Sequence, residues 1–280
     1  MIILAVTRVT AIFFKRELVY MKIGEIKKNY DEIMARPLME YDTIKSELMC
    51  FIKDYSLDDR SGVVKLIEKA KKDIQKIDDE TARVREMMKF ENKYNDKEYI
   101  CGIDEVGRGP LAGPVLTAAV VLPRNLVIPY LNDSKQVSKK NRDMLYEIIL
   151  ERAISVSVGM NTAATIDSIG IEKANKDAMK QAVDGLSVRP DLLLIDAVHI
   201  PDIDIPQVSI IKGDCQSVSI AAASIVAKVT RDRIMEEMDK KYPGYGFKSN
   251  VGYGSAEHIK AIKENGPCEI HRKTFITHFI

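Results

Sequence analysis

The sequence predicts an α/β fold, a mixed sheet flanked by helices, with a helical extension at the N-terminus. Three observations support this prediction. Residues 21–96 are highly charged, nearly free of glycine and spaced as in helices. From residue 97 onward, short runs rich in Val, Ile and Leu are punctuated by Gly and Pro, which is typical of strands. The last two of these runs alternate with helical segments, so the sheet is expected to carry helices.

The length, composition and charge of the chain limit the functions it can have. Its 280 residues, 46% of them hydrophobic, suffice for one good-sized core and an appendage. Because 42 basic residues balance 41 acidic ones, any contact with nucleic acid must come from a local patch. No CxxC pair occurs, so we expect neither a zinc site nor disulfides, and we expect a reducing, cytoplasmic setting for the cysteines Cys50, Cys101, Cys215 and Cys268.

Residues 1–20 are a doubtful upstream segment. They begin with an apolar stretch, but Arg8 interrupts it well before the roughly 20 residues that a membrane span needs. A secretory cleavage site with small residues is also lacking. Met21 opens an ordinary helical start, and we therefore hypothesise that translation of the native protein begins there. N-terminal sequencing of the protein made from its native locus tests this, and a fragment beginning at Met1 would refute it.

Residues 21–96 form the predicted helical extension. Apolar side chains recur at three- and four-residue steps, as at Leu66, Ile67, Ala70, Ile74 and Ile77. The charges are mixed in sign, which fits either a solvated face or a binding surface.

Residues 97–280 form the predicted catalytic domain. Its expected strands are the runs "YICGID", "VLTAAVVLP", "RAISVSVGM", "DLLLIDA" and "QVSIIKG". Little helix separates the first two runs, so we expect a hairpin there. Helices are expected over residues 168–186 and 217–242.

Acidic residues end two of the predicted strands. Asp104, followed by Glu105, ends the first run, and Asp196 ends the fourth. Ligands gather at the carboxyl ends of strands in open α/β sheets, so these acids are candidates for one site. The alternative is that each aspartate only caps the turn that follows it.

A further acid comes from the long predicted helix. Its positions Ser217, Ala221, Ser224, Lys228 and Asp232 fall on one face, beside small alanines that let the helix approach the sheet. Asp232 is then expected to point toward the sheet, where an aspartate needs a partner.

If these acids converge in the folded chain, the sequence predicts a metal site. Two ionised carboxylates about 4 Å apart repel by about 4 kcal/mol at an effective dielectric near 20. Hard oxygen ligands without matching histidine or cysteine select Mg²⁺ or Mn²⁺. Two such ions about 4 Å apart are the usual device for in-line phosphoryl transfer.

With these residues in place, the sequence closely resembles the ribonuclease HII family, the type 2 ribonucleases H of bacteria, over about residues 97–276. The resemblance rests on seven blocks in order, "DEVGRGPLAGPV", "NDSKQVSKKNR", "LLIDA", "IIKGDCQSVSIAAASIVAKVTRDR", "YPGYGF", "GYGS" and "GPCEIHRKTF". It implies a ribonuclease-H-like fold with a mixed five-stranded sheet. It also implies an endonuclease that hydrolyses the RNA strand of RNA/DNA hybrids and nicks duplex DNA at embedded ribonucleotides, leaving 5′-phosphate and 3′-hydroxyl ends.

The resemblance also assigns residues. The family's four metal-binding carboxylates match Asp104, Glu105, Asp196 and Asp232. We rank Asp214 below Asp232, because its position before the helix suggests an N-cap.

Substrate contacts are likewise implied by the resemblance. Gly107, Arg108 and Gly109 match the Gly-Arg-Gly run that touches the ribonucleotide, whose 2′-hydroxyl separates RNA from DNA. Tyr253 matches a tyrosine that stacks on the sugar at the RNA-to-DNA junction, and Lys135 matches a lysine near a phosphate. The alternatives are a plain turn, a packing tyrosine and a surface lysine.

A local basic surface could bind phosphates despite the neutral total charge. Its candidates are Lys212, Lys228, Arg231, Arg233, His271, Arg272 and Lys273. The chain departs from common family patterns at Gln136 and Val137 and at Asn250 and Val251, which could weaken phosphate binding without touching the metal ligands. We expect a monomer that binds hybrid and ribonucleotide-containing duplexes and no membrane.

Two alternatives remain. Ribonuclease HIII shares the carboxylates, but it usually carries a β-rich N-terminal domain and a lysine in the Gly-Arg-Gly run, so Arg108 and the helical extension disfavour it. A non-catalytic hybrid-binding module would be expected to lose an acid, yet all four are present.

Overall fold

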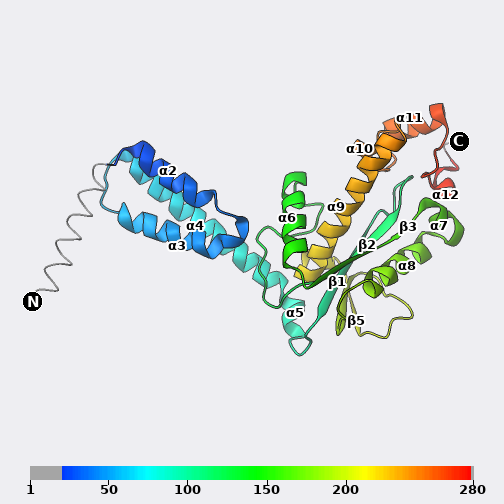
Figure 1. Cartoon of the computed structure of the whole chain (residues 1–280), viewed down its shortest axis with the longest axis horizontal. Helices are drawn as coiled ribbons and strands as arrows, with labels where there is room; N and C mark the ends of the chain where they lie inside the picture. The colour runs from blue at the N-terminus through cyan, green and yellow to red at the C-terminus, as the bar shows by residue number, and fades with distance from the viewer. Residues whose placement is uncertain (1–20, 279–280) are drawn as a thin grey trace, which may run out of the picture. The chain divides into compact units, whose positions relative to one another are not determined.

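The computed structural model describes residues 21–278 of the chain (Figure 1). The chain divides into two compact units, one ending at Arg83 and the other beginning at Val84. The proposed start at Met21 concerns residues 1–20, which lie outside the described residues.

The first unit is helical, as predicted. It contains α2 (Ile23–Met34), the 3₁₀ turn η1 (Leu38–Glu40), α3 (Tyr41–Asp54) and most of α4 (Ser61–Met87). Its core joins all three helices through side chains such as Ile26, Leu48 and Phe51. The predicted apolar positions of α4 belong to this core or pack against it. The helical extension is thereby confirmed, while its boundary at residue 96 stays a prediction.

The second unit is built on one five-stranded mixed sheet. The strands are β1 (Ile100–Val106), β2 (Val115–Val121), β3 (Ser155–Asn161), β4 (Leu192–Asp196) and β5 (Gln207–Ile210). They lie in the order β3-β2-β1-β4-β5. β1 pairs antiparallel with β2, as the predicted hairpin requires, and parallel with β4. β1 and β4 therefore end at the same edge of the sheet.

Helices cover both faces of this sheet. The remaining elements are α5 (Lys89–Lys93), α6 (Lys139–Arg152), α7 (Ala163–Ile169), α8 (Ile171–Asp184), η2 (Gly213–Cys215), α9 (Val218–Lys241), α10 (Phe247–Asn250), α11 (Ala256–Asn265) and α12 (Lys273–Ile276). Cys101 and Ile103 of β1 share a core with Met179 of α8. Ile100, with the opposite alternation, shares a core with Ile220 of α9. Because strand side chains alternate between faces, α8 and α9 lie on opposite sides of β1.

Contact between β1 and α9 is close enough to require glycine. A Cβ on Gly102 would lie 2.0 Å from the backbone carbon of Ser219. The small residues noted in the sequence, Ala222, Ala223 and Ala227, are all buried in α9. This close approach fixes how far the side chains of α9 extend toward the strand ends.

Three further features bear on the sequence predictions. The helix expected over residues 168–186 is split at Gly170, whose φ of +82° ends α7 before α8 begins. All four cysteines are free, as expected. Among residues 21–278, no helix is both long and apolar enough to span a bilayer.

Candidate active site

Asp104 and Glu105 leave the end of β1 on opposite faces of the sheet. Asp104 is 7% exposed on the α9 side, where Ser224 hydrogen-bonds to it. Burial, together with the nearby charges of Glu105 and Asp196, raises the pKa of Asp104 well above its usual range. The backbone N–H of Glu105 donates to Oδ1 of Asp104 at 2.8 Å. The carboxylate is therefore held in one orientation although its charge is disfavoured.

Glu105 faces the α8 side, and both positive and negative neighbouring charges act on the pKa of its carboxyl group. Burial raises the pKa of its carboxyl group, Arg108 opposes this, and Asp196 adds to it. Arg108 Nη1 lies 3.5 Å from Oε1 of Glu105. Oε2 is buried and has no hydrogen-bond partner of standard geometry among the described residues. An unsatisfied carboxylate oxygen at this depth favours a cationic ligand.

Asp196, at the end of β4, lies against the turn that carries Asp214. The N–H of Gly213 donates to Oδ1 of Asp196 at 2.9 Å. Burial raises the pKa of Asp214, and the charges of Asp133 and Asp196 raise it further. Ala197, which follows Asp196, has a φ of +51°, a costly conformation for a residue with a Cβ. The fold thus imposes strain where β4 delivers its carboxylate.

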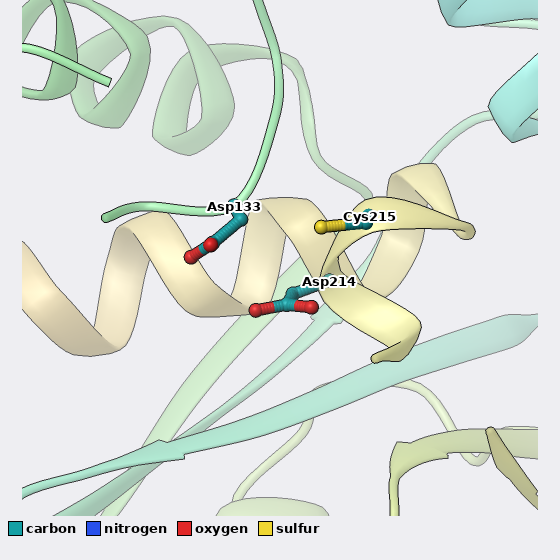
Figure 2. Close-up of side chains that lie close together, drawn as sticks. All are labelled: Asp133, Asp214 and Cys215. Carbon is teal, nitrogen blue, oxygen red and sulfur yellow. The ribbon is translucent and has the colours of Figure 1, made fainter. Parts of the chain in front are cut away.

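Asp133 and Cys215 complete the acidic side. Figure 2 shows Asp133, from the loop before α6, close to Asp214 and Cys215 of η2. Oxygen or sulfur atoms of the three residues lie within 4.8 Å of one another. We call the five carboxylates of Asp104, Glu105, Asp133, Asp196 and Asp214 the acid cluster.

Lys135 supplies positive charge to the acid cluster. Its backbone N–H donates to Asp133 Oδ1 at 2.9 Å, which places the side chain beside the site. Burial would lower the pKa of Lys135, but the charges of Asp133, Asp104, Asp214 and Asp196 outweigh that effect and raise it. Lys135 is thus a cation poised next to a candidate phosphate position.

The structure places Asp232 differently from the prediction. It lies on the predicted face of α9, but its Oδ1 accepts a hydrogen bond from Lys228 Nζ at 2.7 Å. Ser224, the α9 residue that contacts Asp104, is eight positions earlier, which is about 12 Å along a helix. Asp214, ranked lower from sequence, is instead the acid that interacts with Asp196. The expected N-cap role of Asp214 is wrong, because Ser217 caps α9.

The Gly-Arg-Gly run begins the loop of residues 107–114. Gly107 has a φ of +90°, and a Cβ there would lie 2.3 Å from Arg231 Nε. Gly109 differs, because a Cβ there would meet no atom within 4 Å. Packing within the described residues therefore explains Gly107 but not Gly109.

Two arginines predicted for the phosphate surface are buried instead. Arg231 and Arg272 are both 0% exposed. Arg231 donates to the carbonyls of Ala112, Pro114 and Val251. Arg272 donates to those of Gly107, Arg108 and Gly113. This arginine pair holds the 107–114 loop, so its predicted role in phosphate contact is wrong.

His271 is also buried, and it belongs to a hydrogen-bonded relay below Tyr253. His258 Nδ1 lies 2.8 Å from the Tyr253 carbonyl oxygen and therefore donates to it. The Nε2 atoms of His258 and His271 are 3.1 Å apart, and the N–H of Cys268 donates to His271 Nδ1 at 2.9 Å. Both rings are consequently neutral, and each has one tautomer. The Tyr253 side chain itself is 45% exposed.

The other predicted basic residues vary in their partners. Lys228 pairs with Asp232, and Arg233 pairs with Glu147. Lys212 and Lys273 are exposed and remain candidates for phosphate contact. At the positions that depart from the family pattern, Gln136 is exposed, and Val251 accepts the Arg231 hydrogen bond.

Sequence reasoning missed several residues at the site. Asp133 stands in a motif block, yet only Lys135 was singled out there. Asn175 is 2% exposed on α8. Its signal was an amide three and four positions before the buried Ala178 and Met179, on an otherwise apolar face.

Comparisons with known proteins identify the family of the chain. The family model described as ribonuclease HII matches residues 101–278, and the one described as ribonuclease HII N-terminal domain matches residues 36–95. A ribonuclease HII from Lachnoclostridium phytofermentans is 58% identical over 80% of this chain and 89% of its own length. One from Bacillus cytotoxicus is 51% identical over 78% and 85%. A crystal structure of ribonuclease H2 from Pyrococcus horikoshii matches with a TM-score of 0.53 and 25% identity, over 63% of this chain and 93% of that one.

Proposed function

The chain belongs to the ribonuclease HII family, a family of metal-dependent endoribonucleases that cleave the RNA of RNA/DNA hybrids, and from this premise we propose that it also nicks duplex DNA at embedded ribonucleotides. The products are 5′-phosphate and 3′-hydroxyl ends. The observation that carries the proposal is the acid cluster near the ends of β1 and β4, in which the pKa values of three members, Asp104, Glu105 and Asp214, are raised. A cluster of this kind needs a bound cation.

We assign the cation ligands to Asp104, Glu105, Asp196 and Asp214, with Asp214 in the place first given to Asp232. The donors are hard carboxylate oxygens, one of them buried and unpartnered, and this set fits Mg²⁺ or Mn²⁺. Bound there, two such ions would supply activation of the attacking water and stabilisation of the leaving oxygen. Cys215 is a soft ligand, and burial raises the pKa of its thiol, so it is not assigned to these ions.

The substrate is bound by the 107–114 loop and its neighbours. Because the space around Gly109 is open, the backbone of the loop can approach the sugar and phosphate of the substrate closely. Arg108, half exposed beside Glu105, and Lys135, beside the other acids, bind phosphates that flank the cleaved bond. Tyr253 presents an exposed ring that contacts the ribose, and its backbone is fixed by His258. The proposed substrate contacts all come from one chain. This is consistent with action as a monomer.

A cleavage assay tests the proposal. The protein is incubated with a DNA duplex that carries one ribonucleotide, and with the all-DNA duplex as control, with Mg²⁺, Mn²⁺ or EDTA. We expect one nick at the ribonucleotide that requires the metal, and no cut in the control. Tight binding without a cut under any metal would instead identify a hybrid-binding module.

A further inference from the structure

Asn175 is a buried side chain whose amide oxygen the fold does not satisfy. It lies on α8 and is 2% exposed. Its Oδ1 is buried and has no hydrogen-bond partner within residues 21–278. An unpaired buried amide oxygen costs about 1–3 kcal/mol, so a role beyond packing is indicated.

The neighbour of Asn175 is Glu105. Burial raises the pKa of Glu105 overall, and a hydrogen bond from the side-chain amide of Asn175 opposes part of that rise. Since Oε2 of Glu105 has no partner of standard geometry in the described part of the chain, the contact has room to shorten. The pair thus contains one donor, the side-chain amide N–H group of Asn175. It also contains two acceptor oxygens without partners, Oδ1 of Asn175 and Oε2 of Glu105.

Asn175 lines a concave region beside the acid cluster. A cavity of about 340 Å³ is lined by Arg108, Asn175, Lys176, Ala197 and His199, among others. Ala197 directly follows Asp196, and Arg108 contacts Glu105, so the cavity adjoins the proposed cation site. Asn175 is thereby in a position to meet water or ligand that enters from this side.

The two neighbouring acids of β1 are supported in parallel ways. Asp104, on the α9 face, receives a hydrogen bond from Ser224, whose Oγ is 3.0 Å from Ser134 Oγ. Glu105, on the α8 face, receives one from Asn175. Each carboxylate therefore has one neutral donor from the helix that covers its own side of the sheet. Such donors orient ligands and keep them ionised.

We propose that Asn175 is a positioning residue, which orients Glu105 through its amide group and offers its free Oδ1 to the hydration water of a divalent cation held by Glu105. The inference rests on the proposed role of Glu105 as a cation ligand. Mg²⁺ and Mn²⁺ retain several waters when few carboxylates bind them, and those waters need acceptors. The orphaned oxygen of Asn175 is an acceptor of this kind.

The test measures Mn²⁺ affinity without nucleic acid, from the electron paramagnetic resonance signal of free Mn²⁺. Asn175→Leu removes both polar groups and excludes water, and we expect it to weaken binding by about 10- to 100-fold. Asn175→Ala leaves room for a replacement water and should lose less. In cleavage of the single-ribonucleotide duplex, both variants should lower kcat with little change in KM.

The matched control is Asn161, another buried asparagine that contacts α8. Its side-chain amide donates to the Ala174 carbonyl and to Asp177, so the fold uses both of its N–H groups. Asn161→Ala should lower the melting temperature and leave Mn²⁺ affinity unchanged. Wild-type Mn²⁺ affinity in both Asn175 variants, or an equal loss in Asn161→Ala, would overturn the inference. Wild-type protein that binds no Mn²⁺ would overturn it together with the assigned cation site, whereas intact Mn²⁺ binding without cleavage would reject only the nuclease activity.

Discussion

The acid cluster and the arginine pair are two groups of buried charge that contact the same segment of chain and are stabilised in opposite ways. Arg231 and Arg272 have no carboxylate hydrogen-bonded to them in the described structure, yet backbone carbonyls receive their N–H groups. Burial lowers the pKa of Arg272 to about 9, so it is still charged at neutral pH. Within the acid cluster, burial and the neighbouring negative charges raise the pKa values of Asp104, Glu105 and Asp214, and an oxygen of Glu105 is left unpaired.

This difference separates structural charge from functional charge. A buried ion that the fold satisfies by itself serves the fold, because its removal leaves other groups unpaired. A buried ion that the fold leaves unsatisfied indicates a ligand. Substitutions in the two groups should therefore change different quantities, the rate of cleavage in one and the free energy of unfolding in the other.

The largest effect is expected on activity at Asp196. Asp196→Asn should slow cleavage by about 1,000-fold or more, or about 4 kcal/mol, because a cation ligand stabilises mainly the transition state. Its free energy of unfolding without metal should be unchanged or slightly higher, since one repelling charge is removed. Asp232→Asn is the matched variant and should stay within a few-fold of wild type. A similar loss in both variants would restore Asp232 as a ligand.

The next effect is on stability, at Arg272. Arg272→Met should lower the free energy of unfolding of the second unit by about 3–5 kcal/mol, since the carbonyls of Gly107, Arg108 and Gly113 lose their donor. Urea denaturation at fixed pH measures this. A loss under about 1 kcal/mol combined with weaker duplex binding would mean that Arg272 contacts phosphate after all.

The two glycines of the Gly-Arg-Gly run should differ in the same way, since one substitution should change stability and the other should change substrate binding. Gly107→Ala should cost roughly 2–3 kcal/mol of unfolding free energy, because of its positive φ and the clash with Arg231. Gly109→Ala should leave stability within about 0.5 kcal/mol of wild type but weaken binding of the duplex. Fluorescence anisotropy with a labelled duplex and thermal unfolding separate the two outcomes. Equal destabilisation by both substitutions would remove the argument for close substrate approach at Gly109.

The smallest effect is the dependence of stability on pH through the histidine relay. Burial and the neighbouring His258 lower the pKa of His271 to about 4 in the folded state, against an unfolded value near 6.5. The unfolded chain therefore binds more protons between these values, so this stability is present above pH 6.5 and is lost as the pH falls toward 4. We expect a loss of about 3 kcal/mol over that interval. Unfolding of His271→Gln should show a flatter pH dependence, and an unchanged slope would contradict the neutral relay.

Much of the fold follows from local patterns in the sequence. The five apolar runs became the five strands, and Asp196 ends β4 as expected, whereas Asp104 lies two residues before the end of the parallel neighbour β1. These predictions succeed because strand burial and strand ends depend on nearby residues.

The predictions that failed concern distances between residues that are far apart in the sequence. No local sequence pattern contains those distances. Periodicity gives the face of a helix but not which of its turns meets a strand end, so it could not choose between Asp232 and Asp214. Arginine is almost always exposed or paired with an acid, and nothing in "TRDR" or "IHRK" indicates burial among carbonyls. Asn175 appeared to be one polar residue in an apolar stripe until Glu105 was found beside it.

The most direct measurement is an anomalous-scattering map from a crystal soaked in Mn²⁺. We predict peaks within about 2.3 Å of carboxylate oxygens of Asp104, Glu105, Asp196 and Asp214, and none at the Lys228–Asp232 pair. A peak bound to Asp232, or a map with no peak at the ends of β1 and β4, would contradict the assignment of the acid cluster as the cation site.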